Sequence, residues 1–207
     1  MANYQRVIAS LVLTAIPVLA TADGDVVFGR ELAESERCQQ CHDQVAEHTP
    51  KHSGQLAHYL VKQLEDFQKG ARRHPVMNKM AADLTDLDRR DIAAYYASLP
   101  AMQGPGVEPG GDTGRRLFVQ GAPERGLPAC RDCHGEKGQG QVHDGMAVPR
   151  LAGQQQAYLD RQLRNWRSGE RANSPGKVMN RIAERLSDAE IKALSRWLAT
   201  IRLSAAH

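Results

Sequence analysis

Two short segments of this 207-residue chain carry the same pattern: two cysteines separated by two residues and followed at once by a histidine. The segments are Cys38, Cys41 and His42, and Cys130, Cys133 and His134. A thioredoxin-type dithiol requires a βαβ context, which the sequence lacks, and a zinc site requires four ligands, for which an adjacent histidine leaves cramped geometry. The third interpretation is covalent c-type haem. Two thiols on one helical turn form thioethers with the two vinyl groups of the haem, and the histidine binds the iron. The repeated motif favours this interpretation and predicts two covalently bound haem c groups.

Two methionines recur after the two motifs. Haem iron in cytochromes c commonly takes a methionine as its second axial ligand, which raises the reduction potential. Met77 and Met179 occupy equivalent places, each seven residues before a leucine that leads into the last helix of its copy. We therefore predict these two methionines as axial ligands, opposite His42 and His134. Three further methionines have no methionine counterpart and are interpreted as packing or incidental residues: Met80, Met102 and Met146.

The first copy is richer in histidine than the second. Four imidazoles in it are alternatives to Met77 as a ligand, although a solvated surface histidine is the ordinary case: His48, His52, His58 and His74. His52 stands where the second copy has Leu151, at a position expected to pack on the porphyrin. This difference predicts a more polar first pocket and two unequal haem potentials.

A proline precedes the repeated Gly-Gln pair in each copy, at Pro50 and Pro149. The carbonyl groups of these prolines are candidates to accept a hydrogen bond from the motif histidine, because ligating imidazoles are usually oriented by such a bond. The alternative is an ordinary proline that breaks a helix.

Each copy has the signature of a helical unit. Apolar residues recur at helical spacing in 56–67 and 158–166, and Thr85 and Ser187 each begin a capping-box-like pattern before the last helix of a copy. No alternating pattern of useful length predicts a strand. These features predict an all-α fold.

A glycine lies in the expected first helix of each copy, at Gly29 and Gly114. Tyr95 and Trp197 occupy equivalent positions in the last helices. A small residue facing an aromatic one would let the first and last helices of a copy cross closely, so we interpret all four as core residues.

The chain is a tandem duplication. The copies are offset by 92 residues at the cysteine motif, by 99 at a Tyr-Leu-x-x-Gln-Leu segment and by 102 at Val-Met-Asn. Residues 105–111 are rich in glycine and proline and are predicted to be a linker between two domains, residues 23–104 and 112–207.

Residues 1–22 have the order of a secretory signal peptide. A short start with one positive charge precedes the apolar segment 7–19, and Ala20 and Ala22 form a cleavage pattern. An uncleaved membrane anchor is the alternative. We predict export to the periplasm, with membrane association at most peripheral.

Composition limits the function further. A formal net charge of +3 is weak grounds for nucleic-acid binding, and no nucleic-acid partner is expected. Residues 23–104 carry 10 Lys and Arg against 13 Asp and Glu, whereas residues 105–207 carry 16 against 11. This split suits a carrier that orients differently at different partners.

The ten aromatic residues are few for two small cores, so we expect two porphyrins to complete these cores and the apo-protein to fold poorly.

Together these motifs resemble dihaem cytochrome c4 and related class I cytochromes c. The resemblance rests on the tandem cysteine motifs, the repeated Gly-Gln-x-x-x-Tyr-Leu-x-x-Gln-Leu segment and the following methionine, and it extends over the chain after residue 22. It implies two class I cytochrome c folds related by a pseudo-twofold axis, with the haems at the interface. The first copy departs from the family pattern, because its loop at 43–49 is short and lacks the glycines of the second copy.

The resemblance also implies electron transfer in the periplasm rather than catalysis. An iron with two protein ligands has no open position for substrate, so the expected work is outer-sphere electron transfer. Expected partners are periplasmic or membrane-bound redox proteins: a terminal oxidase, a cytochrome bc1 complex or a dehydrogenase. The alternatives are a dedicated cytochrome subunit of a periplasmic dehydrogenase, for example one that oxidises sulfur compounds, a haem enzyme with an open first iron, and a disulfide or zinc protein.

Overall fold

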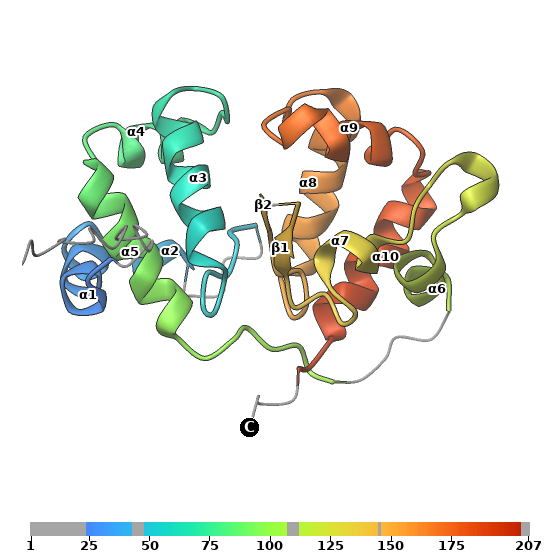
Figure 1. Cartoon of the computed structure of the whole chain (residues 1–207), viewed down its shortest axis with the longest axis horizontal. Coiled ribbons are helices and arrows are strands. Elements are labelled where there is room, and N and C mark those ends of the chain that lie inside the picture. Colours follow the sequence, from blue (N-terminus) through green and yellow to red (C-terminus); the bar gives the residue numbers. More distant parts are fainter. Residues whose placement is uncertain (1–23, 43–47, 107–111, 145, 204–207) are drawn as a thin grey trace, which may run out of the picture.

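The computed structural model describes residues 24–42, 48–106, 112–144 and 146–203. The predicted signal peptide, most of the predicted linker and most of the short loop of the first copy lie outside these residues. In the described part of the chain the fold is helical, as predicted, and the helices gather into two lobes that lie side by side (Figure 1).

The helices of the N-terminal lobe are α1 (Val26–Ser35), α2 (Cys38–His42), α3 (Ala57–Gln68), α4 (Pro75–Ala81) and α5 (Asp86–Ser98). They include the expected first helix, the helical segment near 56–67 and the last helix, together with α4, which was not predicted. The predicted capping box at the start of α5 is confirmed, because Thr85 and Asp88 exchange side-chain-to-backbone hydrogen bonds. This exchange satisfies backbone donors that the first turn of a helix otherwise leaves without partners.

The C-terminal lobe repeats this order. Its helices are α6 (Thr113–Gln120), α7 (Cys130–His134), α8 (Gln156–Ser168), α9 (Val178–Ala183) and α10 (Asp188–Thr200), with short 3-10 turns η1 (Pro123–Arg125) and η2 (Pro175–Lys177). A capping box formed by Ser187 and Glu190 begins α10, again as predicted.

The C-terminal lobe also contains a small antiparallel ribbon, although no strand was predicted from the sequence. Strands β1 (Gln141–His143) and β2 (Met146–Val148) pair with Val142 opposite Ala147. Three residues per strand are too few to show an alternating pattern. The ribbon turns at Asp144, whose φ of 48° is tolerated because a short polar side chain can enter the left-handed region.

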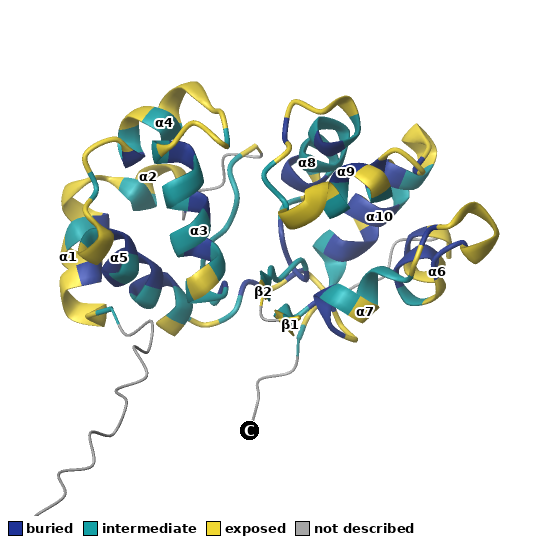
Figure 2. Cartoon of the chain, turned by 45° about the horizontal axis from the view of Figure 1, so that its top comes forward, coloured by how far each residue is buried: buried dark blue, intermediate teal, exposed yellow. Residues whose placement is uncertain are grey.

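Each lobe has its own hydrophobic core. The N-terminal core consists of Ala33, Leu60, Ile92, Ala93, Tyr95 and Tyr96. The C-terminal core is larger: Leu117, Phe118, Ala122, Leu127, Leu159, Leu186, Ile191, Leu194, Trp197 and Leu198. Figure 2 shows the buried residues gathered inside each lobe, with exposed residues over the outer helices.

The first and last helices of each lobe cross closely at a glycine. A Cβ atom on Gly29 would lie 1.9 Å from the carbonyl oxygen of Asp91, and one on Gly114 would lie 2.3 Å from that of Ala193. The close crossing is therefore as predicted. In the C-terminal lobe the predicted aromatic residue borders the crossing, because the Cβ atom of Trp197 would lie 2.8 Å from the added Cβ atom. In the N-terminal lobe the three nearest atoms all belong to the backbone of Asp91 and Ile92, one turn before Tyr95.

Candidate haem centres

The two cysteine motifs form short helices in equivalent places, α2 and α7. All four cysteines lie among the described residues, and none of them is in a disulfide. Burial raises the pKa of the Cys130 thiol to about 11, so this thiol is protonated at neutral pH and is a poor nucleophile for dithiol exchange. Among the described residues, no group of three or more His, Cys, Asp or Glu gathers as a metal site would require.

Each motif histidine is buried and held by the predicted proline carbonyl. His42 Nδ1 donates to the Pro50 oxygen at 2.9 Å, and His134 Nδ1 donates to the Pro149 oxygen at 3.0 Å. A carbonyl only accepts, so the proton of each neutral ring sits on Nδ1, and Nε2 is the ring nitrogen that carries the lone pair. Burial also lowers the pKa of His134, which favours this neutral form.

The group beside the motif histidine differs between the lobes, as the sequence predicts. The ring of His52 lies 4.0 Å from the ring of His42 and 5.3 Å from that of Tyr96, measured between centroids. Burial, with the nearby His42 and Arg72, holds the pKa of His52 well below its usual range. Leu151 occupies the equivalent place in the C-terminal lobe and packs on its apolar core. The first centre is therefore the more polar one.

Met77 and Met179 lie near the starts of α4 and α9, both half-buried. The residue after each is an asparagine whose amide binds two backbone carbonyls. Asn78 Nδ2 donates to Phe67 and Arg72, and Asn180 Nδ2 donates to Trp166 and Arg171. The same local anchor therefore holds both methionines, while their role as iron ligands stays a prediction.

The remaining methionines differ in their surroundings. Met146 is exposed on the ribbon, and Met80 is half-buried. Met102 is not incidental: it is 4% exposed, and its sulfur accepts a hydrogen bond from Gln154 at 3.4 Å. Its place in the connection between the lobes was not apparent from the sequence because that connection has no repeat.

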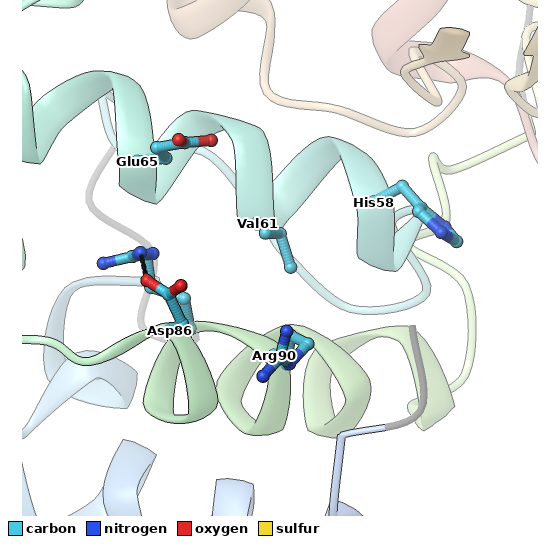
Figure 3. Close-up of a pocket in the computed structure, with 6 residues that line it drawn as sticks. His58, Val61, Glu65, Asp86 and Arg90 are labelled. Atoms are coloured by element: carbon cyan, nitrogen blue, oxygen red, sulfur yellow. Dashed lines mark hydrogen bonds and ion pairs between the residues drawn. The ribbon is translucent and has the colours of Figure 1, made fainter. Parts of the chain in front are cut away.

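The alternative histidines of the first copy are distributed over different elements. His74 caps α4 and accepts from the backbone N–H of Met77 at 3.4 Å, and His48 is exposed. His58 lies on α3 in a shallow pocket between α3 and α5, together with Glu65 and Arg90 (Figure 3). Neither His42 nor Met77 lines this pocket.

A polar network joins the lobes and repeats across them. Arg72 donates to Tyr158 at 3.0 Å and to Gln162 at 3.0 Å, and its equivalent Arg171 donates to Tyr59 at 3.1 Å and to Gln63 at 2.9 Å. Each guanidinium also lies over an aromatic ring of its own lobe. Neither arginine was predicted from the sequence to lie at a functional site. The repeat nevertheless marks them as equivalent, because Arg72 and Arg171 are 99 residues apart, as are Tyr59 and Tyr158.

The network concentrates positive charge in a buried place. Arg72 and Arg171 form no ion pair with a carboxylate of the described residues. Burial opposes ionisation of Tyr158, but the two guanidiniums outweigh it and hold the pKa of this phenol below its usual value. The interface therefore favours additional negative charge.

Comparison with known proteins decides the family. The model of the family described as Cytochrome c matches residues 112–202. A cytochrome c4 from Pseudomonas aeruginosa is 36% identical over 199 residues, covering 93% of this chain and 97% of the relative. The chain belongs to the cytochrome c4 family. A crystal structure of reduced recombinant cytochrome c4 from Pseudomonas stutzeri matches with a TM-score of 0.79 and 33% identity, over 87% of this chain and all of that one.

The cytochrome c4 family establishes the general function. The chain is an electron-transfer cytochrome of the type that carries covalent haem c, and it is not itself an enzyme. Cytochromes c4 are periplasmic, and none of the helices in the described residues is long and apolar enough to cross a bilayer. A second kind of relative is the "Thiosulfate dehydrogenase electron acceptor" of Stutzerimonas stutzeri, 36% identical over 190 residues and covering 87% of each chain.

Proposed function

We propose that this cytochrome c4 holds two haem c groups, one in each of the domains 23–104 and 112–207, and passes electrons through both. Cys38 and Cys41 attach the first group and Cys130 and Cys133 the second; the axial pairs are His42 with Met77 and His134 with Met179. The pair of histidine-to-proline hydrogen bonds carries the proposal, because each holds a buried motif histidine at an equivalent place, as such a bond holds a ligating imidazole.

The residues present fit such groups chemically. Cysteine thiols supply the covalent attachment of haem c, and a neutral imidazole and a methionine thioether are the iron ligands common in cytochromes c. The excess positive charge of Arg72 and Arg171 suits the carboxylates of haem propionates. A haem supplies one-electron redox chemistry when it is bound. The chain orients the imidazoles, limits access of water and sets the polarity around each centre.

Haem counting tests the two-centre proposal. A pyridine haemochrome assay and an intact mass on the holoprotein should give two haems per chain. Replacing both cysteines of one motif by serine should leave one haem. One haem in the wild-type chain would refute the proposal.

The near-infrared band of methionine-ligated ferric haem tests the axial pairs. We expect Met77→Ala and Met179→Ala each to remove half of this band. The matched control is Met146→Ala, which changes an exposed methionine outside the proposed sites and should leave the band unchanged. Retention of the full band in Met77→Ala would mean that another residue, such as one of the nearby histidines, completes the first centre.

Export is the second part of the proposal. The apolar segment 7–19 and the alanines at 20 and 22 support cleavage after Ala22. N-terminal sequencing of the periplasmic form should begin at Asp23. A periplasmic protein that retains Met1 would contradict cleavage.

The second candidate function is that of a dedicated electron acceptor for a thiosulfate dehydrogenase. The 36% identity to a relative of that description favours it. Stopped-flow reduction by such an enzyme and co-purification from the native organism separate the two roles. A free carrier reacts with several partners and purifies alone, whereas a dedicated subunit co-purifies with its dehydrogenase.

The charge difference between the halves supports orientation at those partners. If the arginine-rich half docks, raising ionic strength should slow the bimolecular reaction, because salt screens exposed charges. A rate that is insensitive to salt would remove this part of the proposal.

A further inference from the structure

In each of the two lobes, one buried glutamine side chain forms hydrogen bonds with the backbone of the other lobe. Gln55 and Gln154 belong to the repeated Gly-Gln elements and are 4% and 3% exposed. The carboxamide of Gln154 binds both backbone groups of Lys51, accepting from its N–H at 2.9 Å and donating to its carbonyl at 2.9 Å. Gln55 binds Arg150 in the same way, at 2.8 Å and 3.0 Å. Each lobe therefore holds a backbone segment of the other.

The segment held in this way is the one that orients the motif histidine. The N–H of Lys51 and the carbonyl of Pro50 belong to the same peptide group, and that carbonyl accepts from His42 Nδ1. A continuous chain of hydrogen bonds thus runs from Gln154, through this peptide group, to His42. The equivalent chain runs from Gln55, through the peptide group of Pro149 and Arg150, to His134.

We propose that Gln154 is a positioning residue for His42, and Gln55 for His134, so that each lobe tunes the iron ligand of the other. This inference rests on the proposed role of these histidines. An acceptor on the peptide N–H polarises the peptide and makes its carbonyl a stronger acceptor, because hydrogen bonds in a chain strengthen one another. The histidine then gains imidazolate character, which raises its basicity as a ligand and stabilises ferric iron.

The proposal predicts a crosswise effect on reduction potentials. Gln154→Leu removes the acceptor in the C-terminal lobe and should raise the midpoint potential of the N-terminal centre. We expect about a threefold change in its oxidised-to-reduced ratio at fixed ambient potential, since polarisation changes a bond by roughly 10–30%. Gln55→Leu should raise the potential of the C-terminal centre instead. In each variant the other centre should keep its potential.

An NMR-monitored redox titration of the full-length holoprotein resolves the two centres. The signals of the first centre are assigned as those that His52→Leu perturbs most, because His52 lies against His42. Gln154→Glu is the rescue variant, since a carboxyl oxygen still accepts from the N–H of Lys51 and should hold the first potential at or below the wild-type value. The control Asn173→Ala breaks interface hydrogen bonds to Gln63 and Asp66 without touching either peptide chain.

The outcomes separate the inference from the function on which it rests. A crosswise pattern, with rescue by Gln154→Glu and no such pattern in Asn173→Ala, supports the inference. Potentials that stay unchanged, shift in the same lobe or shift equally in both lobes overturn it, provided that the variants carry two haems. A wild-type chain with fewer than two haems would count against the proposed function itself.

Discussion

The two lobes share one scaffold but differ in the residue beside the motif histidine and in the size of the core. The N-terminal lobe places the imidazole of His52 there and relies on a small core, whereas the C-terminal lobe places Leu151 there within a larger apolar cluster. The backbone contacts around the two histidines are nearly identical. Duplication has therefore preserved the orientation of the motif histidine, while the residue beside it differs in polarity between the lobes.

The largest expected effect comes from removing the covalent attachment in one lobe at a time. A small domain buries a smaller fraction of its surface, so a lobe with few core residues depends more on a bound apolar group. We expect Cys38→Ser with Cys41→Ser to abolish cooperative unfolding of the N-terminal lobe. Cys130→Ser with Cys133→Ser should weaken the C-terminal lobe without abolishing its structure. Calorimetry measures the cooperative unfolding of each variant, and far-ultraviolet circular dichroism measures its helical content. Equal losses in the two variants would show that the two lobes depend on haem to the same extent.

The close helix crossings should be equally sensitive in both lobes. Alanine at Gly29 or Gly114 would place a Cβ atom against a backbone carbonyl that cannot move away by rotating a side chain. We expect each variant to lower the free energy of unfolding by about 3 kcal/mol, the upper range for overpacking. Urea titrations of the holoprotein measure this, with Glu31→Ala on an exposed position of α1 as the control. A small loss at one glycine only would show that this crossing can relax.

Acid should destabilise the C-terminal lobe through Glu190. Its hydrogen bond to Arg125, at 2.6 Å, holds the pKa of this carboxyl at about 2. Because the folded pKa lies below the usual value of 4.5, the stabilisation is present above about pH 4.5 and is lost as the pH falls towards about 2. Arg125 is 40% exposed and solvent screens the pair, so we expect Glu190→Gln to lower the free energy of unfolding at pH 7 by about 1 kcal/mol.

Urea titrations across pH 2–7 test this, and the difference between wild type and Glu190→Gln should shrink as the carboxyl is protonated. A difference that does not change with pH would assign the effect of Glu190 to its capping geometry alone.

The smallest expected effect is on the potentials. His52→Leu makes the first pocket resemble the second, and a less polar environment disfavours the extra charge of ferric haem. We expect the midpoint of the first centre to rise towards that of the second by about 60 mV, a tenfold change for one electron. The reciprocal variant Leu151→His should lower the midpoint of the second centre. A fall in the first midpoint would show that His52 tunes the centre by something other than polarity.

Much of each centre could be predicted from the sequence because its parts are close together in the chain. The cysteines and histidine share one helical turn, and the accepting proline follows within 8 residues in one copy and 15 in the other. The capping boxes at Thr85 and Ser187 are equally local. The repeat itself indicated which methionines and glycines occupy equivalent places.

The rest depends on contacts between residues that are about half the chain apart. Gln154 and Lys51 are 103 residues apart, and Arg171 and Tyr59 are 112 apart. A repeat shows that two residues are equivalent, but equivalence does not say whether each binds within its own copy or across to the other. Only the packing of the two lobes decided that.

The sequence by itself therefore determined the local features of each candidate centre, because thiol spacing, the hydrogen bond from histidine to proline and helix capping act over a few residues. The tertiary structure alone decided that the two lobes share an interface of the Arg72 and Arg171 guanidiniums and of the glutamines Gln55 and Gln154. The physical reason is that a buried polar group takes the nearest partner in space, and here the nearest partner of each lobe belongs to the other.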